Sequence, residues 1–371
     1  MKVAELDYEL PSRLIAQHPL AERDGSRMLV LDKGRQRWQD RQFQELPDIL
    51  RGDELLVCNN ARVIPGRLLG RRLGVRSGSV GKQKRLKGEY LRSQIEVLLL
   101  RQLELGIWES LVRPGRKVGT GERLVFGNGE IEAEVISRGE LGLRTIRLTA
   151  REDLSAVLER VGHVPLPPYI RRPDEPNDRT RYQTIFAKRP GAIAAPTAGL
   201  HFSGQIVDRL KARGVEICEL TLDVGLGTFQ PIRCETVGNH QMHSESYDIP
   251  ESTAVAIQQA RRSGRPILAI GTTVVRALEA AAAKGPIPWR PERDRQRVEI
   301  SSGRGETDLF IYPGYAFWVV DQLLTNFHLP RSSLLAMVAA FAGRDFLLRA
   351  YAHAIEEEYR FYSYGDCMLI R

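Results

Sequence analysis

Two kinds of hydrophobic segment alternate along most of the chain. Residues 55–58 and 266–270 are short and almost wholly apolar, which is typical of strands that are covered on both faces of a sheet. Residues 251–263 and 274–283 are predicted helices that lie between such strands in the sequence. This alternation predicts an α/β fold in which a mixed sheet is flanked by helices.

The pattern changes over residues 67–149, where short β-type pieces alternate with glycine-containing or charged turns. Their spacing is typical of a small barrel or sandwich. The pieces are residues 95–100, 108–112, 123–126, 131–136 and 143–148. A chain of 371 residues also exceeds the usual size of one domain. We therefore expect a discontinuous α/β main domain of residues 1–66 and 152–371, with an all-β, barrel-like domain of residues 67–151 inserted into it.

Residues 71–92, inside this β-rich stretch, contain few apolar side chains and many Lys, Arg, Gly and Ser. Such a composition predicts a mobile loop. The loop could follow the phosphates of a nucleic acid, but a charge run is more often a solvated insertion. We assign none of its lysines to an active site.

A segment near the C-terminus combines the signals of a strand, a polar loop and a helix start. Residues 309–312 are predicted as a short strand, and a second apolar run leads to Asn326 and His328. Either Ser332 or Ser333 could then cap the next helix. Open α/β sheets bind ligands where strand ends and helix amides converge, so this segment predicts the binding site.

Composition narrows the class of protein. The hydrophobic fraction of 42% is enough for buried cores, and no apolar stretch approaches the ~20 residues that cross a bilayer. The first residues show no secretory pattern, so we expect a cytoplasmic protein that does not enter a membrane. The formal net charge of +8 favours polyanionic partners, with nucleic acid as the first candidate. The alternative is a basic surface that binds no particular partner.

Neither the cysteines nor the histidines support a metal site. The four cysteines lie far apart and form no Cys-x-x-Cys pair, which argues against a zinc knot or a disulfide framework. His240, His243 and Glu245 resemble part of a metal-binding set, but their spacing fits no common zinc signature. No metal is predicted.

Three segments rich in small residues could approach a ligand closely. The Gly-x-Gly of residues 225–227 follows a predicted strand, but it lacks the third glycine of a dinucleotide-binding loop. Residues 191–202 are rich in Ala and Gly, which allow a ligand or a second backbone to come near. Thr272 and Thr273 stand at a predicted helix start and could hold a carboxylate or a ribose.

Nine segments in one order resemble a single family. They are residues 7–11, 62–65, 194–202, 224–229, 240–243, 271–273, 307–314, 324–330 and 359–361. Several are long and unusual, such as Ala-Ala-Pro-Thr-Ala-Gly-Leu-His-Phe at residues 194–202 and Leu-Thr-Asn-Phe-His-Leu-Pro at residues 324–330. Together they resemble the S-adenosylmethionine:tRNA ribosyltransferase-isomerases of queuosine biosynthesis.

The resemblance implies a transfer of the ribosyl group of S-adenosylmethionine to 7-aminomethyl-7-deazaguanine in the anticodon loop of a tRNA. The ribosyl group isomerises to an epoxycyclopentane, adenine and methionine leave, and epoxyqueuosine-tRNA is formed. S-adenosylmethionine is therefore a consumed substrate, and no further cofactor is implied. The expected partners are S-adenosylmethionine and this tRNA, and a monomer is expected.

This reaction needs proton transfer, and histidine is the side chain whose ordinary pKa lies closest to working pH. His201, His243 and His328 are therefore the catalytic candidates. His201 is favoured because small residues surround it in sequence, although a buried structural histidine is the alternative for each. Asp308 is also a catalytic candidate. Both Asp308 and Glu306 could offset the sulfonium charge or hold the methionine ammonium.

Arg62 follows a buried strand and could bind the methionine carboxylate or a tRNA phosphate. The preceding Asn59 and Asn60 could contact a base edge or simply stabilise a turn. Arg360 lies in an aromatic segment that could stack on a base, with packing against the main domain as the alternative. The predicted substrate-binding set also contains Thr197, Gly199, Gly227, Thr228, Thr272, Thr273, Glu306 and Asn326.

The chain departs from the family pattern at several positions. Asp223 stands where the family more often has His, so no catalytic role is assigned there. Two other functions compete with the ribosyl transfer. A non-catalytic RNA-binding module would bind tRNA without consuming S-adenosylmethionine. A methyltransferase would normally have a glycine-rich turn after its first strand, where this chain has Asn59 and Asn60.

Overall fold

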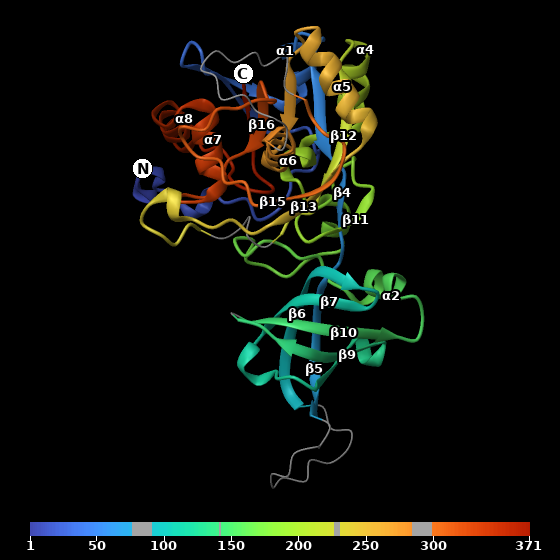
Figure 1. Cartoon of the computed structure of the whole chain (residues 1–371). Helices are drawn as coiled ribbons and strands as arrows, with labels where there is room; N and C mark the ends of the chain where they lie inside the picture. Colours follow the sequence, from blue (N-terminus) through green and yellow to red (C-terminus); the bar gives the residue numbers. More distant parts are fainter. Residues whose placement is uncertain (76–90, 141, 226–230, 284–298) are drawn as a thin grey trace.

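The computed structural model describes residues 1–75, 91–140, 142–225, 231–283 and 299–371. Figure 1 shows two lobes, an α/β body that contains the N- and C-terminal segments and a barrel joined to it by the chain segments around β4 and α2. The fold class expected from the sequence is confirmed. Within the described ranges, no helix is long and apolar enough to cross a bilayer.

Nine strands of the described residues form a mixed sheet in the order β15-β13-β12-β3-β14-β16-β17-β1-β2. Their bounds are β1 (Arg27–Asp32), β2 (Arg37–Gln42), β3 (Leu55–Asn59), β12 (Glu216–Leu222), β13 (Glu245–Ile249), β14 (Ile267–Ile270), β15 (Gly303–Thr307), β16 (Gln322–Asn326) and β17 (Cys367–Ile370). Strands β12, β3, β14 and β16 run parallel, so their carboxyl ends share one edge of the sheet.

The central strands are buried on both faces because their alternate side chains enter two different cores. Leu55 and Val57 pack with helices α5 (Glu251–Arg262), α6 (Thr272–Ala283), α7 (Ser333–Ala342) and α8 (Arg344–Glu356). Leu56 and Cys58 pack with α1 (Leu46–Ile49) and α4 (Gly204–Ala212) on the other face. This two-sided burial explains why β3 is apolar throughout.

The second lobe is a closed barrel in the order β10-β7-β6-β5-β8-β9, with every neighbouring pair antiparallel. Its strands are β5 (Arg67–Val75), β6 (Leu91–Glu104), β7 (Ile107–Arg113), β8 (Glu122–Phe126), β9 (Ile131–Arg138) and β10 (Leu143–Ala150). Helix α2 (Leu154–Val161) packs Val157 and Leu158 against the barrel core. The packing unit therefore extends past residue 151, where the inserted domain was expected to end.

Short elements connect the lobes to the sheet. Strands β4 (Ala61–Val63) and β11 (Arg189–Ala192) form a parallel pair beside the barrel, and α3 (Asp178–Arg181) precedes β11 in the sequence. The 3₁₀ turn η6 (Thr197–His201) contacts β16.

Two local predictions were wrong. Residues 71–75 and 91–92 belong to β5 and β6 rather than to a mobile loop, because closing the barrel requires a sixth strand. The rest of that predicted loop, residues 76–90, lies outside the described residues. The strand expected at residues 309–312 is instead β15, which ends at Thr307 because the amide of Leu309 donates to Thr307 Oγ1 at 3.1 Å rather than to a neighbouring strand.

Candidate functional site

A pocket opens at the carboxyl edge of the parallel strands. The turn after β14 contributes Gly271 and Thr272, and the end of β16 contributes Asn326 and His328. Thr197 of η6 and the adjoining small residues line another side. The pocket has the position expected of a ligand site in an open α/β sheet, at the edge that the segment near the C-terminus indicated.

Two helices begin at this pocket. Thr272 is the first residue of α6, and the positive φ of Gly271, 93°, allows the sharp turn from β14. Ser332, a pocket residue, caps α7 by accepting a hydrogen bond from the amide of Leu335 at 3.2 Å. Free amide groups at helix starts, together with the helix dipoles, favour a negatively charged group of a ligand.

His328 lines the pocket and is held firmly in place. Its Nε2 lies 2.7 Å from Thr325 Oγ1, its amide donates to the hydroxyl of Tyr351 at 3.0 Å, and its carbonyl accepts from the hydroxyl of Tyr8. No described residue hydrogen-bonds to Nδ1. The side chain is 8% exposed, and burial lowers its pKa to about 3. The imidazole is therefore neutral near pH 7, and Nδ1 is the nitrogen left for a ligand.

His201 does not line this pocket, although it was the favoured catalytic residue. Its Nδ1 lies 2.6 Å from Ser26 Oγ, and its Nε2 lies 3.1 Å from Asn326 Nδ2. Burial, with a smaller contribution from Arg360, lowers its pKa to about 3. Both ring nitrogens are occupied by protein groups, and His201 lies behind Asn326 as seen from the pocket.

The small residues near His201 serve packing as well as access. Gly199 is absent from the pocket lining, and a Cβ atom at this position would lie 2.9 Å from the Thr184 side chain. Glycine is therefore needed so that η6 can pack closely against residue 184. Thr197, at the start of the same turn, does line the pocket.

Tyr169 and Tyr362 form an aromatic wall of the pocket, with ring centroids 4.6 Å apart. The Tyr169 hydroxyl lies 2.6 Å from Ser363 Oγ. Tyr362 has φ of 72°, a conformation that side-chain-bearing residues rarely adopt and that often marks functional sites. Tyr362 lies in the aromatic segment that the sequence analysis noted around Arg360, but neither residue had been assigned to the site.

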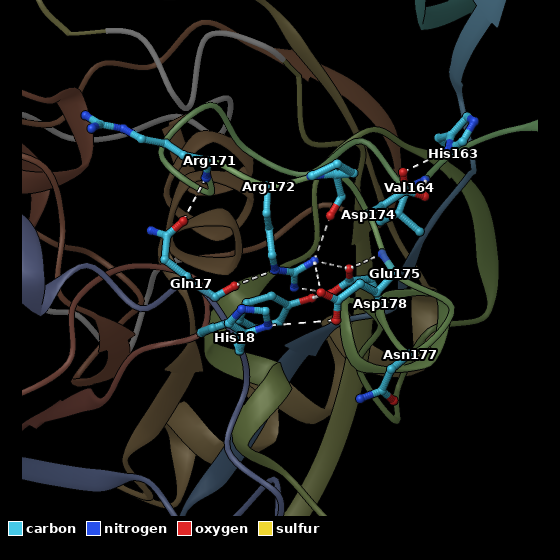
Figure 2. A network of polar contacts seen from close by, with 12 residues as sticks. Gln17, His18, His163, Val164, Arg171, Arg172, Asp174, Glu175, Asn177 and Asp178 are labelled. Atoms are coloured by element: carbon cyan, nitrogen blue, oxygen red, sulfur yellow. Dashed lines mark hydrogen bonds and ion pairs between the residues drawn. The ribbon is translucent and has the colours of Figure 1, made fainter.

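The segment that carries Tyr169 is anchored by the polar network in Figure 2. Arg172 donates to both carboxylate oxygens of Asp178, at 2.6 and 2.9 Å, and to the carbonyl of Gln17 at 3.0 Å. The Tyr364 hydroxyl also donates to Asp178, at 2.7 Å. One buried carboxylate thus ties three distant segments of the chain together beside the pocket.

Several predicted residues lie elsewhere. Arg62 pairs with Glu159 at 3.0 Å and lines a separate groove beside the barrel. The Arg360 guanidinium donates to the carbonyl of His18 and does not line the pocket, so its position gives no support for stacking on a base there. Their guanidinium groups are held by protein partners, which the sequence could not reveal.

The predicted acidic residues and His243 also lie away from the pocket. Glu306 is on the edge strand β15, where it lies 4.0 Å from Arg101 of the barrel, and the exposed Asp308 follows that strand. His243 is exposed in the segment before β13. None of the three lines the pocket, because the edge strand is several strands away from β14 and β16. Gly227 and Thr228 lie outside the described residues.

Other polar residues noted in the sequence are part of the framework. Asn59 accepts from the amides of Ala61 and Leu222, which stabilises the turn after β3. Glu245 pairs with Arg276 and accepts from the amide of Gly225 at 2.8 Å, so it is not grouped with the histidines of residues 240–243. Among the described residues, no group of acidic, histidine or cysteine side chains could hold a metal ion.

Thr197, Thr272, Thr273, Asn326 and His328 are thus the predicted residues that the structure brings together. Thr325 was missed, although it lies within the Leu-Thr-Asn-Phe-His-Leu-Pro segment. Ser26 could not be found from the sequence, because nothing near it in the chain indicates its contact with His201.

Comparisons with known proteins agree over the whole chain. A family model described as queuosine biosynthesis protein matches residues 3–370. An S-adenosylmethionine:tRNA ribosyltransferase-isomerase from Solibacter usitatus is 50% identical and one from Syntrophotalea carbinolica is 47% identical, each over 100% of both chains. The crystal structure of an S-adenosylmethionine tRNA ribosyltransferase from Thermotoga maritima covers 99% of this chain and all of that one, with 36% identity and a TM-score of 0.53. The chain therefore belongs to the queuosine biosynthesis protein family.

Proposed function

We propose that this protein is an S-adenosylmethionine:tRNA ribosyltransferase-isomerase. It transfers the ribosyl group of S-adenosylmethionine to 7-aminomethyl-7-deazaguanine in the anticodon loop of a tRNA and isomerises it, with release of adenine and methionine. The observation that carries the proposal is the full-length match to enzymes of that name, with identities of 41–50%. The pocket at the carboxyl edge of the sheet supports it with a site at the position where open α/β sheets bind ligands.

In this proposal the helix starts bind the methionine part of the substrate. The amides at the first turns of α6 and α7 face a common pocket, and they suit the methionine carboxylate. The Thr272 hydroxyl, at the start of α6, lies in position for the same group or for a ribose hydroxyl. The aromatic wall of Tyr169 and Tyr362, whose rings are tilted by 46° to each other, offers ring faces on which a purine can stack.

We infer that His328 is the proton acceptor. The sulfonium acidifies the hydrogens on the adjacent 5′-carbon of the ribose, and removal of one of them leaves an ylide. In this proposal His328 Nε2–H donates to Thr325 Oγ1, so Nδ1 is the unprotonated nitrogen and can take that proton, whereas both nitrogens of His201 are used within the protein. Thr325 fixes the orientation of the His328 ring through Nε2.

The proposal also includes where the enzyme works. Its tRNA substrate is a cytoplasmic molecule, so we place the enzyme in the cytoplasm. We also propose a monomeric enzyme, which rests on the resemblance to the family alone. S-adenosylmethionine is consumed as a substrate, and we assign no metal to the site.

The decisive experiment supplies S-adenosylmethionine, labelled in both the adenine and the methionine parts, with tRNA that carries the aminomethyl base. We expect release of free adenine and free methionine in equal amounts, and a mass increase in the tRNA. Transfer of a methyl group, or tRNA binding without any consumption of S-adenosylmethionine, would show that the proposal is wrong.

A further inference from the structure

The side-chain amide of Asn326 has only one possible orientation. One of its terminal atoms lies 3.1 Å from the carbonyl oxygen of Tyr362 and 3.4 Å from that of Asp366. Carbonyl oxygens can only accept hydrogen bonds, so this atom is the NH₂ group and the other is the oxygen. The usual ambiguity between the nitrogen and oxygen of an asparagine amide is therefore absent here.

This orientation fixes the tautomer of His201. The same NH₂ group of Asn326 lies 3.1 Å from Nε2 of His201, so Nε2 must accept. The proton of the neutral ring is then on Nδ1 and is donated to Ser26 Oγ, 2.6 Å away. Asn326 thus donates to His201, and His201 donates to Ser26, in one directional chain of hydrogen bonds that begins at the wall of the pocket.

The oxygen of the same amide has no partner. Asn326 is 2% exposed and lines the pocket, and its Oδ1 is buried without a hydrogen bond from any described residue. A hydrogen-bond acceptor that is buried without a donor lowers the free energy of unfolding by on the order of 1–3 kcal/mol. The protein uses three acceptors to hold the NH₂ side and leaves the oxygen unpaired at a ligand pocket, which indicates that a ligand supplies the missing donor.

We propose that Asn326 Oδ1 accepts a hydrogen bond from an amino group of the substrate, and that His201 and Ser26 are positioning residues that hold the amide in this orientation. The proposal rests on the proposed function for the identity of the substrates. They offer three amino groups, namely the α-amino group of the methionine part, the 6-amino group of adenine and the aminomethyl group of the RNA base.

The first test compares binding of matched ligands by titration calorimetry. S-adenosylmethionine is measured beside its analogue without the α-amino group and its analogue with purine in place of adenine. The tRNA arm compares a base with an aminomethyl group to one with a methyl group. Loss of the recognised amino group weakens binding to the unmodified enzyme about tenfold, and an Asn326→Leu variant shows no such difference.

The chain provides a matched control. Gln322, on the same strand β16, also carries a buried amide oxygen without a partner, but it pairs with Leu268 at the far end of the strand and does not line the pocket. A Gln322→Met variant keeps the full difference between ligands with and without the amino group. If all three pairs of ligands show the same ratio of affinities in the unmodified enzyme and in Asn326→Leu, the proposal is overturned.

The second test separates positioning from proton transfer at His201. A His201→Gln variant retains an acceptor near the position of Nε2, and it keeps kcat within a few-fold of the unmodified enzyme. A His201→Leu variant has no acceptor and loses the preference for the amino group, with KM affected more than kcat. Equal losses of kcat of a hundredfold or more in both variants would identify His201 as a base and refute a positioning role.

Thermal unfolding checks that each variant folds. If His201→Leu does not fold, it is replaced by Ser26→Ala, which removes only the partner of His201 Nδ1.

The outcome of these tests is separable from that of the proposed function. If the ligand preference depends on Asn326 while adenine and methionine are not released, the binding inference stands and the proposed reaction fails. If adenine and methionine are both released but the ligand preference does not depend on Asn326, the proposed reaction stands and the binding inference fails.

Discussion

Two buried histidines near the pocket differ in what remains available on their rings. His201 uses both nitrogens within the protein, whereas His328 uses only Nε2, toward Thr325. Both have a pKa lowered to about 3 by burial, so both are neutral under ordinary conditions. The difference in their roles therefore comes from their partners rather than from their ionisation.

A change of His328 to Gln is expected to lower kcat by about 10²- to 10⁴-fold, the usual contribution of a general base. Binding of S-adenosylmethionine should remain within a few-fold, because the helix starts and the aromatic wall are unchanged. The measurement is adenine release in single-turnover assays. His18→Gln is the matched control, since this ring is exposed and does not line the pocket. Turnover by His328→Gln at the unmodified rate would remove His328 from the mechanism.

At the level of single elements, the capped start of α7 forms part of the pocket wall. Replacing Ser332 by Ala removes the acceptor for the Leu335 amide and should lower the free energy of unfolding by about 1 kcal/mol. It should also weaken S-adenosylmethionine binding, because the first turn of α7 lies at the pocket.

Asp153→Ala is the control for this change. Asp153 caps α2 by accepting from the Ala156 amide at 2.9 Å, but that helix packs on the barrel. Denaturant unfolding should show a similar loss of stability in both variants, and calorimetry should show weaker ligand binding only in Ser332→Ala. Equal ligand affinities in the two variants would mean that the start of α7 does not bind the substrate.

The anchored segment that carries Tyr169 depends on one carboxylate. Asp178→Asn removes the charge that Arg172 contacts through two hydrogen bonds, and it leaves the largely buried guanidinium with only Glu175, 3.8 Å away, as an acidic partner. The expected loss in the free energy of unfolding is about 3–5 kcal/mol. Asp48→Asn breaks the exposed pair with Arg209 and should cost less than about 1 kcal/mol. Similar losses in the two variants, measured by urea unfolding, would contradict a structural role for the Asp178 network.

The sequence predicted elements well where a local signal determines the structure. The apolar β3, the capped α7 and the position of the pocket all follow from patterns within a few residues. It failed where a distant partner decides the outcome. Arg62 is held by Glu159, and His201 is held by Ser26, a residue far away in the chain. Closure of the barrel likewise turns part of a charged segment into β5, because the neighbouring strands supply its hydrogen bonds.

For the whole molecule, the two buried histidines make stability depend on pH. The unfolded chain binds a proton at each near the ordinary value of 6.5, but the folded chain does not until the pH approaches about 3. Between these values the unfolded state holds more protons, so the free energy of unfolding falls as the pH falls. The stabilisation is fully present above about pH 6.5.

Urea unfolding at a series of pH values from 7 to 4 measures this dependence. Each histidine contributes a slope of at most about 1.4 kcal/mol per pH unit. The double variant His201→Gln/His328→Gln should show a shallower slope than the unmodified protein, and the exposed control His18→Gln should not. An unchanged slope in the double variant would show that other groups determine the acid sensitivity.

Strand β17 lies in the interior of the sheet, between β16 and β1, with Cys367 opposite Met28. A nascent chain on the ribosome therefore carries an open gap between two of its strands until residues 367–370 have emerged. The carbonyl of Asp366, which helps to orient Asn326, arrives at the same late moment. Ligand-binding competence should consequently require residues 366–370, because both the filling of the sheet and the orientation of Asn326 depend on them.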